Sequence, residues 1–487
     1  MKKKNIGVNA LLNVIKSGLS VIFPLITYPY ALRKLGADAV GKVSYGDSIV
    51  SYFSLIAMLG IATYAVREGV RKKHDRSQFT QFASEMFTIN VTAMIAAYLL
   101  LIAAVVLVRP LHAYSRLIML QSISIALTVV GVDWINTIFE DFLFTTVRGI
   151  AAHIVSLVLL FVMVKGPDDF YLYALLSITT NAITCITNWI YCRRYAHIRL
   201  TRHPNFRAHM KPILILFVNA LAISIYVNSD TTMLGWIKGD HAVGLYTVAV
   251  RVYTIVKSIM AAIYAVAIPR LAYLIGQADT AGYRKLYSDL WCVLSILLLP
   301  TMTGLICLSD EAMYYMGGAE YLPAASTLQI LAVAMLFAIF GGLVTSCLNV
   351  TLGRERENLQ ATVLGAALNC GLNLILIPLM AQNGAAITTV LAEVIVLGIC
   401  FVRIPQKEIY FDFRRIGRAL LHAGIGSLVI AGYAFCIKQL TVHMLYRIVW
   451  IVPGSVLLYG ILLLVLRDEY AVQALQQLKR KLGRTHE

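Results

Sequence analysis

Long apolar stretches follow one another along the 487-residue chain, with only short polar segments between them. A helix of about 20 apolar residues crosses a hydrocarbon core of about 30 Å and satisfies its own backbone hydrogen bonds in lipid. The pattern therefore predicts an all-α polytopic membrane protein of about 14 transmembrane helices. The expected spans are 6–32, 43–66, 84–108, 117–138, 142–164, 171–192, 212–236, 243–267, 288–308, 323–350, 360–380, 384–403, 417–437 and 448–466.

A basic segment near the middle of the chain, 193–211, divides the predicted helices into two comparable sets of six. A short repeat agrees with this division, because Gly36–Gly41 (GADAVG) and Gly239–Gly244 (GDHAVG) share four of six residues at equivalent places. We therefore expect two pseudo-symmetric six-helix lobes, typical of a two-lobed transporter. The predicted parts are an N-lobe at 1–192, a basic cytoplasmic linker at 193–211, a C-lobe at 212–403, two extra helices at 404–466 and a cytoplasmic tail at 467–487.

Composition and charge support a membrane location. Hydrophobic residues make up 59% of the chain and charged residues 14%, against about a quarter charged in an average soluble domain. With the N-terminus inside, most of the 42 Lys and Arg residues fall in cytoplasmic segments, and both termini are then cytoplasmic. The net charge of +17 is thus chiefly a topology signal, and nucleic acid is not an expected partner. The linker 193–211 is the densest basic segment, and it would either anchor to anionic lipid or bind a partner protein or acidic substrate.

Polar residues inside the spans indicate where function lies, because an unpaired charge at the bilayer centre costs at least about 2.5 kcal/mol. Three spans carry polar residues at helical spacing, so that each set forms a stripe on one face of its helix. The sets are Asn9, Asn13, Lys16, Ser20 and Thr27 in span 6–32; Ser44, Asp47, Ser51 and Ser54 in span 43–66; and Thr247, Arg251, Thr254 and Ser258, with Lys257 beside them, in span 243–267. The stripes come from both predicted lobes. They therefore predict a shared aqueous cleft.

Single carboxylates occur in other spans, namely Asp133, Asp230 and Glu393. Each would either pair with a neighbouring Arg or Lys or serve a coupling ion, as would Asp47. Asn369 and Asn373 are expected to form hydrogen bonds between helices. The eight cysteines form no CxxC pair, and no nucleotide-binding P-loop or metal motif is present, so no metal site or cofactor is expected.

The opening of the chain carries a more specific pattern. The segments are Phe23–Tyr30 (FPLITYPY), Leu35-Gly36, Gly41, Ser48–Phe53 (SIVSYF), Leu59–Ile61 (LGI) and Arg67-Glu68, with Glu140–Phe142 (EDF) further on. This pattern resembles bacterial polysaccharide flippases, the Wzx-type O-antigen and exopolysaccharide transporters. Their superfamily also holds the lipid II flippases and the multidrug and toxin extrusion antiporters.

The resemblance implies two lobes arranged as a V, which move undecaprenyl-diphosphate-linked oligosaccharide from the inner to the outer leaflet of the bacterial cytoplasmic membrane. Cations on helices one and eight of such flippases are thought to hold the diphosphate, and Lys16 and Arg251 lie on the corresponding helices. Lys257, Asn9, Asn13 and Ser51 would complete the substrate cleft. Coupling to H⁺ or Na⁺ would use Asp47, Asp133, Asp230 or Glu393. Expected partners are the lipid-linked glycan, membrane lipids, and the polysaccharide polymerase and chain-length machinery.

Two alternatives stay open. A multidrug antiporter of the same fold would need an acidic, aromatic cleft for organic cations, and Lys16, Arg251 and Lys257 argue against it. A membrane polysaccharide polymerase or ligase usually needs an extended external loop for its catalytic groups. The longest expected external loop, Ser309–Leu322, carries Asp310, Glu311 and Glu320 without a basic residue. The chain is therefore predicted not to be an enzyme.

Overall fold

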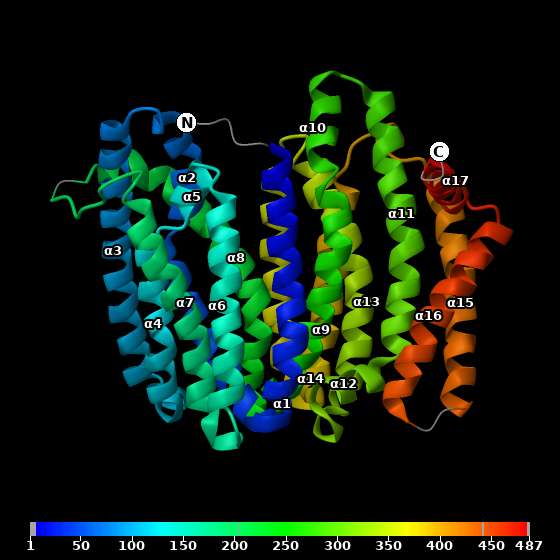
Figure 1. The fold of residues 1–487 in the computed structure, drawn as a ribbon, viewed down its shortest axis with the longest axis horizontal. Coiled ribbons are helices and arrows are strands. Elements are labelled where there is room, and N and C mark those ends of the chain that lie inside the picture. The colour runs from blue at the N-terminus through cyan, green and yellow to red at the C-terminus, as the bar shows by residue number, and fades with distance from the viewer. Residues whose placement is uncertain (1–5, 203, 441–442, 485–487) are drawn as a thin grey trace. The chain divides into compact units, whose positions relative to one another are not determined.

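The computed structural model describes residues 6–202, 204–440 and 443–484, and its side-chain description leaves out 6–17, 19–22, 408 and 477–484. Helices account for nearly all of the described residues, and no strand occurs among them (Figure 1). The α-helices are α1 (Ile6–Met58), α2 (Ile61–Lys72), α3 (Arg76–Leu107), α4 (Ser115–Gly131), α5 (Trp134–Ile138), α6 (Phe142–Met163), α7 (Phe170–Cys192), α8 (Phe206–Lys238), α9 (Asp240–Ala265), α10 (Ile268–Gly276), α11 (Thr280–Cys307), α12 (Ser309–Gly317), α13 (Ala324–Gly342), α14 (Glu355–Val402), α15 (Phe413–Leu440), α16 (Met444–Val465) and α17 (Glu469–Arg484).

Short turns of 3₁₀-helix lie at Arg109–Tyr114, Pro167–Asp169, Ala319–Tyr321 and Lys407–Ile409, and a π-helical turn at Leu343–Asn349 extends α13. Within the described residues, 12 helical stretches are long and apolar enough to cross a membrane. The chain is therefore a multi-spanning membrane protein, and the predicted all-α fold is confirmed.

Two of these stretches are each long enough to cross twice. They include most of α1, a helix of 53 residues, and all of α14, a helix of 48 residues, and each of these helices has about 70–80 Å of length against a core of about 30 Å. Non-helical backbone divides them, at Gly36 (φ 77°) in α1 and at Ala381 (φ 48°) in α14. Counting each half separately gives fourteen crossing segments in the described part of the chain, the number that the apolar pattern predicts.

The structure corrects two of the predicted spans. The span 117–138 is not continuous, because α4 ends at Gly131 and Val132 takes a left-handed conformation (φ 42°) before the short α5. The helix predicted over 43–66 ends at Met58, the last residue of α1. Gly60 (φ 71°) then turns the chain into α2, an amphipathic helix that buries Ile61, Tyr64 and Ala65. Apolar composition alone does not mark these turns, because the residues beyond them are also apolar.

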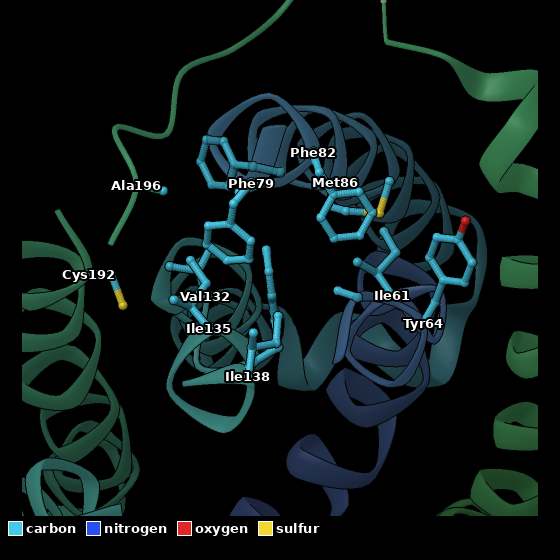
Figure 2. Packing of buried hydrophobic residues seen from close by; sticks show 14 of the residues in the cluster. Ile61, Tyr64, Phe79, Phe82, Met86, Val132, Ile135, Ile138, Cys192 and Ala196 are labelled. Atoms are coloured by element: carbon cyan, nitrogen blue, oxygen red, sulfur yellow. The ribbon is translucent and has the colours of Figure 1, made fainter. Parts of the chain in front are cut away.

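The chain folds into two compact units, residues 1–247 and 248–487. In the first unit a cluster of buried apolar side chains joins α2, α3, α5 and the end of α7. Figure 2 shows Phe79, Phe82 and Met86 of α3 directed toward Ile135 and Ile138 on one side and Ile61 on the other. This cluster fixes α2 and α5 at the ends of the longer helices. The lobe boundaries expected from the basic linker stay a prediction.

In the second unit, aromatic residues of α11 form the best-buried contacts. The Tyr283 hydroxyl donates to Cys347 O (2.9 Å) and the Tyr287 hydroxyl to Leu343 O (3.2 Å), so both tie α11 to the π-helical turn. The Trp291 ring stacks on Phe340 of α13, with ring centroids 4.7 Å apart. These hydroxyls give two carbonyl groups of the π-helical turn a partner on α11.

The segment predicted as the longest external loop, Ser309–Leu322, is mostly helical. Residues 309–317 form α12, and Glu311 on this helix is fully buried. Its carboxylate lies 3.0 Å from Lys438 Nζ and 3.2 Å from Arg447 Nη1. Glu311 therefore holds α12 to the ends of α15 and α16, which is a structural role.

Candidate functional site

The polar stripe on α9 is the best-defined part of the predicted cleft. Arg251, Thr254 and Ser258 are exposed, whereas Val248, Ala249 and Tyr253 of the same helix are buried. Arg251 lies eleven residues after the first residue of α9, or about 16 Å along the axis, near the middle of a bilayer. Accessible polar groups at that depth are stable only if they face water or other polar groups. The stripe therefore indicates a hydrated surface.

Lys257 lies beside the stripe and forms an ion pair inside the second unit. Its Nζ is 3.3 Å from Glu393 Oε1 and 5.3 Å from the centroid of the Tyr253 ring. Glu393, in the second half of α14, is buried, and Lys257 is partly buried. The sequence singles out both residues but does not pair them. An ion pair at this depth balances two charges that would each be costly alone.

The second half of α1 presents another polar stripe, in the first unit. Asp47 is exposed near the middle of this crossing segment, and Ser51 is half-buried. The Ser51 hydroxyl donates to Ser48 O in its own helix (2.7 Å). The Thr232 hydroxyl of α8 donates to Ser48 Oγ (3.0 Å). Asp47 is thus an accessible carboxylate, whereas Ser48 joins α1 to α8.

Asn9, Asn13 and Lys16 lie on the first half of α1, but their side chains fall outside the described residues. Their proposed place in the cleft stays a prediction. Thr27, further along the same segment, donates its hydroxyl to Phe23 O (3.0 Å), a bond within its own helix.

The remaining candidate carboxylates have protein partners. Asp133 lies in the break between α4 and α5 rather than inside a helix, and its Oδ1 is 2.9 Å from Arg148 Nη2 of α6. Asp230 of α8 is buried and accepts a hydrogen bond from the Tyr246 hydroxyl (2.7 Å). Arg148 and Tyr246 are not among the residues predicted from sequence, although Arg148 falls inside the expected span 142–164.

Asn369 and Asn373 face the second half of α14 across the bend at Ala381. Asn369 Nδ2 donates to Thr388 Oγ1 (3.3 Å), Asn373 Nδ2 to Asn369 Oδ1 (3.2 Å), and the Thr388 hydroxyl to Asn373 Oδ1 (2.6 Å). This closed set of bonds joins the two halves of α14, the role that the sequence predicts for the asparagines.

A single buried carboxylate, Asp141, binds three side chains at and just after the end of α7. Asp141 Oδ2 accepts hydrogen bonds from the hydroxyls of Tyr191 (2.6 Å) and Tyr195 (2.5 Å) and from Arg194 Nη2 (2.6 Å). Burial, and then the bond to Asp141, raises the pKa of Tyr195 to about 12. Asp141 belongs to the EDF segment of the family resemblance, and its role here is to hold the start of the linker.

The family of the chain follows from its similarity to known proteins. The sequence profile of the polysaccharide biosynthesis protein family matches residues 3–275, more than half of the chain. The chain belongs to this family. The MatE family profile also matches, over residues 215–375.

The curated relatives of this chain carry the names of transporters and flippases. A putative O-antigen transporter of Shigella dysenteriae is 22% identical over 80% of this chain and 97% of its own length. A probable flippase of Haloferax volcanii, AglR, is 23% identical over 93% of this chain and 94% of its own length. The resemblance to polysaccharide flippases that the opening segments indicate is thereby confirmed.

Solved structures share the fold. The lipid II flippase MurJ in an inward closed conformation superposes with a TM-score of 0.76 at 14% identity, covering 95% of this chain and 100% of that one. An inward-facing multidrug transporter of the MATE family gives a TM-score of 0.62 at 15% identity, over 80% of this chain and 96% of its own. At such identities the likeness concerns the fold alone.

Proposed function

We propose that the protein is a flippase for lipid-linked oligosaccharides, which moves undecaprenyl-diphosphate-linked repeat units from the cytoplasmic to the outer leaflet by alternating access. Family membership, the curated O-antigen transporter and flippase relatives, and the shared fold support this activity. In this proposal the protein lies in the bacterial cytoplasmic membrane with both termini inside. It supplies repeat units for a cell-surface polysaccharide, whose polymerase and chain-length proteins act next.

The observation that carries the proposal is the position of Arg251, an exposed residue at mid-membrane depth on the polar face of α9. An Arg side chain offers a planar fork that binds two phosphate oxygens at once, whereas Lys acts as a point charge. We assign Arg251 and Lys16 to the diphosphate. Asn9, Asn13 and Ser51 are assigned to the surrounding cleft.

The Lys257–Glu393 pair supplies an ion-sensitive element for this transport. With Glu393 ionised, Lys257 is neutralised by it. Uptake of H⁺ by Glu393, or binding of Na⁺ to it, weakens this pair and leaves Lys257 free to attract a diphosphate. Coupling by this route needs no cofactor. Asp47 is a second coupling candidate because its carboxylate is accessible, whereas Asp133 and Asp230 already bind Arg148 and Tyr246.

An apolar groove of about 580 Å³ in the second unit suits the polyprenyl chain of such a substrate. It runs between α11, α15 and α16, and its lining includes Pro300, Gly304, Tyr459 and Gly460. Burying isoprenoid carbons against this lining is favourable by about 25 cal/mol per Å² when the alternative is water. In lipid the polyprenyl chain leaves surroundings that are already apolar, so the favourable free energy comes from close packing against the groove. The groove therefore orients the polyprenyl chain more than it adds to its binding affinity.

The test is the sidedness of lipid-linked glycan in cells depleted of this protein, probed on intact protoplasts with an impermeant glycan-cleaving enzyme. A flippase predicts single repeat units that accumulate on the inner leaflet and resist cleavage. Units that reach the outer leaflet but are not polymerised would instead identify a polymerase or ligase defect.

A multidrug antiporter is the second candidate, because the MatE profile matches residues 215–375. Its cleft would have to attract organic cations, which the exposed Arg251 opposes. The same depletion experiment separates the two, since loss of an antiporter changes drug sensitivity and leaves the lipid-linked glycans unaltered.

A further inference from the structure

The linker between α7 and α8 is attached to the first unit as far as Thr201. The backbone N–H of Arg199 donates to Ser84 Oγ (3.2 Å) and that of Thr201 to Thr88 Oγ1 (3.0 Å), so the linker follows α3. Cys192 and Ala196 are buried at the edge of the apolar cluster, where Figure 2 shows them beside α3 and α5. The backbone that carries Arg193, His197 and Arg199 therefore has a defined position on the first unit.

Two adjoining cavities lie along this attached segment, of about 640 Å³ and 300 Å³. They share His197 and Arg199 in their lining, and together they are called the linker groove. Its other basic residues are Arg76 at the start of α3 and Arg193 at the end of α7, and Ser77 and Thr80 add hydroxyl groups. No carboxylate belongs to the described lining of either cavity.

The nearby carboxylates are used elsewhere. Asp75 caps α3 through the backbone N–H groups of Ser77 (2.8 Å) and Gln78 (3.1 Å), and Glu85 lies 3.0 Å from His209 Nε2. In contrast, the guanidinium groups of Arg76, Arg193 and Arg199 have no hydrogen-bond or ion-pair partner in the described part of the chain. The groove thus concentrates positive charge that the protein does not neutralise, which is the chemistry of a phosphate site.

We propose that the linker groove binds the phosphate headgroup of an anionic membrane lipid. It lies at the ends of two membrane-crossing helices, α3 and α7, where headgroups are located. Beside it the linker exposes the apolar side chain of Leu200, at 64% of its surface, and Phe206 at the start of α8 is 39% exposed. Apolar residues among arginines suit a membrane surface and have no purpose for a small soluble anion. This site is distinct from the transport cleft, and its assignment does not depend on the glycan substrate.

The experiment uses the full-length protein in nanodiscs of phosphatidylcholine, with or without phosphatidylglycerol, and records the unfolding temperature and the bound lipids by native mass spectrometry. Phosphatidylglycerol should raise the unfolding temperature of the wild type. In Arg76→Gln/Arg199→Gln most of this rise should be lost, and apparent lipid affinity should fall by about 10- to 30-fold, as expected for two lost headgroup contacts. Arg76→Lys/Arg199→Lys should retain most of the response.

The matched control is Arg356→Gln/Arg418→Gln, which removes two exposed cations of the second unit and should leave the response unchanged. Sodium diphosphate, added to nanodiscs without phosphatidylglycerol, tests a soluble ligand. An equal response to phosphatidylglycerol in the wild type and Arg76→Gln/Arg199→Gln would overturn the proposal. So would stabilisation by diphosphate in the absence of any response to anionic lipid.

Discussion

Gly41 of α1 and Gly244 of α9 make reciprocal contacts with backbone. A Cβ atom on Gly41 would lie 1.8 Å from Asp240 O, and one on Gly244 would lie 2.0 Å from Ala37 O. Both glycines are the sixth residue of the repeated hexapeptide, and the residue each contacts is the second. The first residues also agree, since Gly36 (φ 77°, ψ 172°) and Gly239 (φ 83°, ψ −173°) share a conformation open only to glycine. The repeat found in the sequence is thus a two-fold-like contact in space.

Replacing Gly41 by Ala should destabilise this contact, because the new methyl group meets a carbonyl oxygen and the helices must separate. Overpacking of this kind costs about 1–3 kcal/mol. The measurement is thermal unfolding of the purified protein in detergent. Gly149→Ala in α6 is the control, since a Cβ there meets nothing within 4 Å, and it should unfold at or slightly above the wild-type temperature. Equal unfolding temperatures for Gly41→Ala and the wild type would contradict the close approach.

Arg251→Ala should reduce glycan export by about 10- to 100-fold, the loss expected for a charged hydrogen bond of about 1.5–3 kcal/mol. Arg251→Lys should restore part of the activity, because it keeps the charge and loses the fork. Export is followed by surface labelling of the polysaccharide, with membrane protein level measured in parallel. Arg418→Ala, an exposed arginine of α15, should export normally. Full export by a well-expressed Arg251→Ala protein would remove the diphosphate assignment.

Glu393→Gln should make transport insensitive to the coupling ion, because the amide neither takes up a proton nor holds Na⁺ by charge. The rate is measured in proteoliposomes with imposed pH and Na⁺ gradients. Loss of the pair also leaves Lys257 unneutralised, so the protein should be less stable. Glu393→Gln/Lys257→Met removes both charges and should recover stability without recovering coupling. Glu355→Gln, at the exposed start of the same helix, controls for loss of one carboxylate. A Glu393→Gln protein that still follows the gradients would place coupling elsewhere.

Gly304→Leu should obstruct the apolar groove and slow transport of the native polyprenyl substrate. The position allows this substitution, because a Cβ there meets nothing within 4 Å. Gly432→Leu in α15 is equally unhindered but outside the groove lining, so it serves as the control. Transport of substrates with shortened prenyl chains should be less affected by Gly304→Leu. Equal slowing of long and short substrates would argue against a role of the groove in lipid positioning.

Much of the fold follows from the sequence because the hydrocarbon thickness of a membrane is a local constraint. A run of about 20 apolar residues is a crossing helix whatever its neighbours are. The same reasoning locates Arg251, Lys257 and Glu393 at mid-membrane depth, and helical spacing places Arg251 on one face with Thr254 and Ser258. The opening segments of the chain also identify the family.

Tertiary structure decided how the polar groups are used. The Lys257–Glu393 pair joins two helices distant in sequence, and the Asp133–Arg148 pair joins the break after α4 to α6. Each pair depends on which helices are neighbours and how each is rotated. The left-handed turn at Val132, which moves Asp133 out of its predicted helix, has no apolar or charge signal. Hydrophobicity determines that a segment enters the membrane, since that free energy depends on its own side chains. Packing between helices determines which charges are neutralised and which remain accessible, since that free energy depends on pairs of segments.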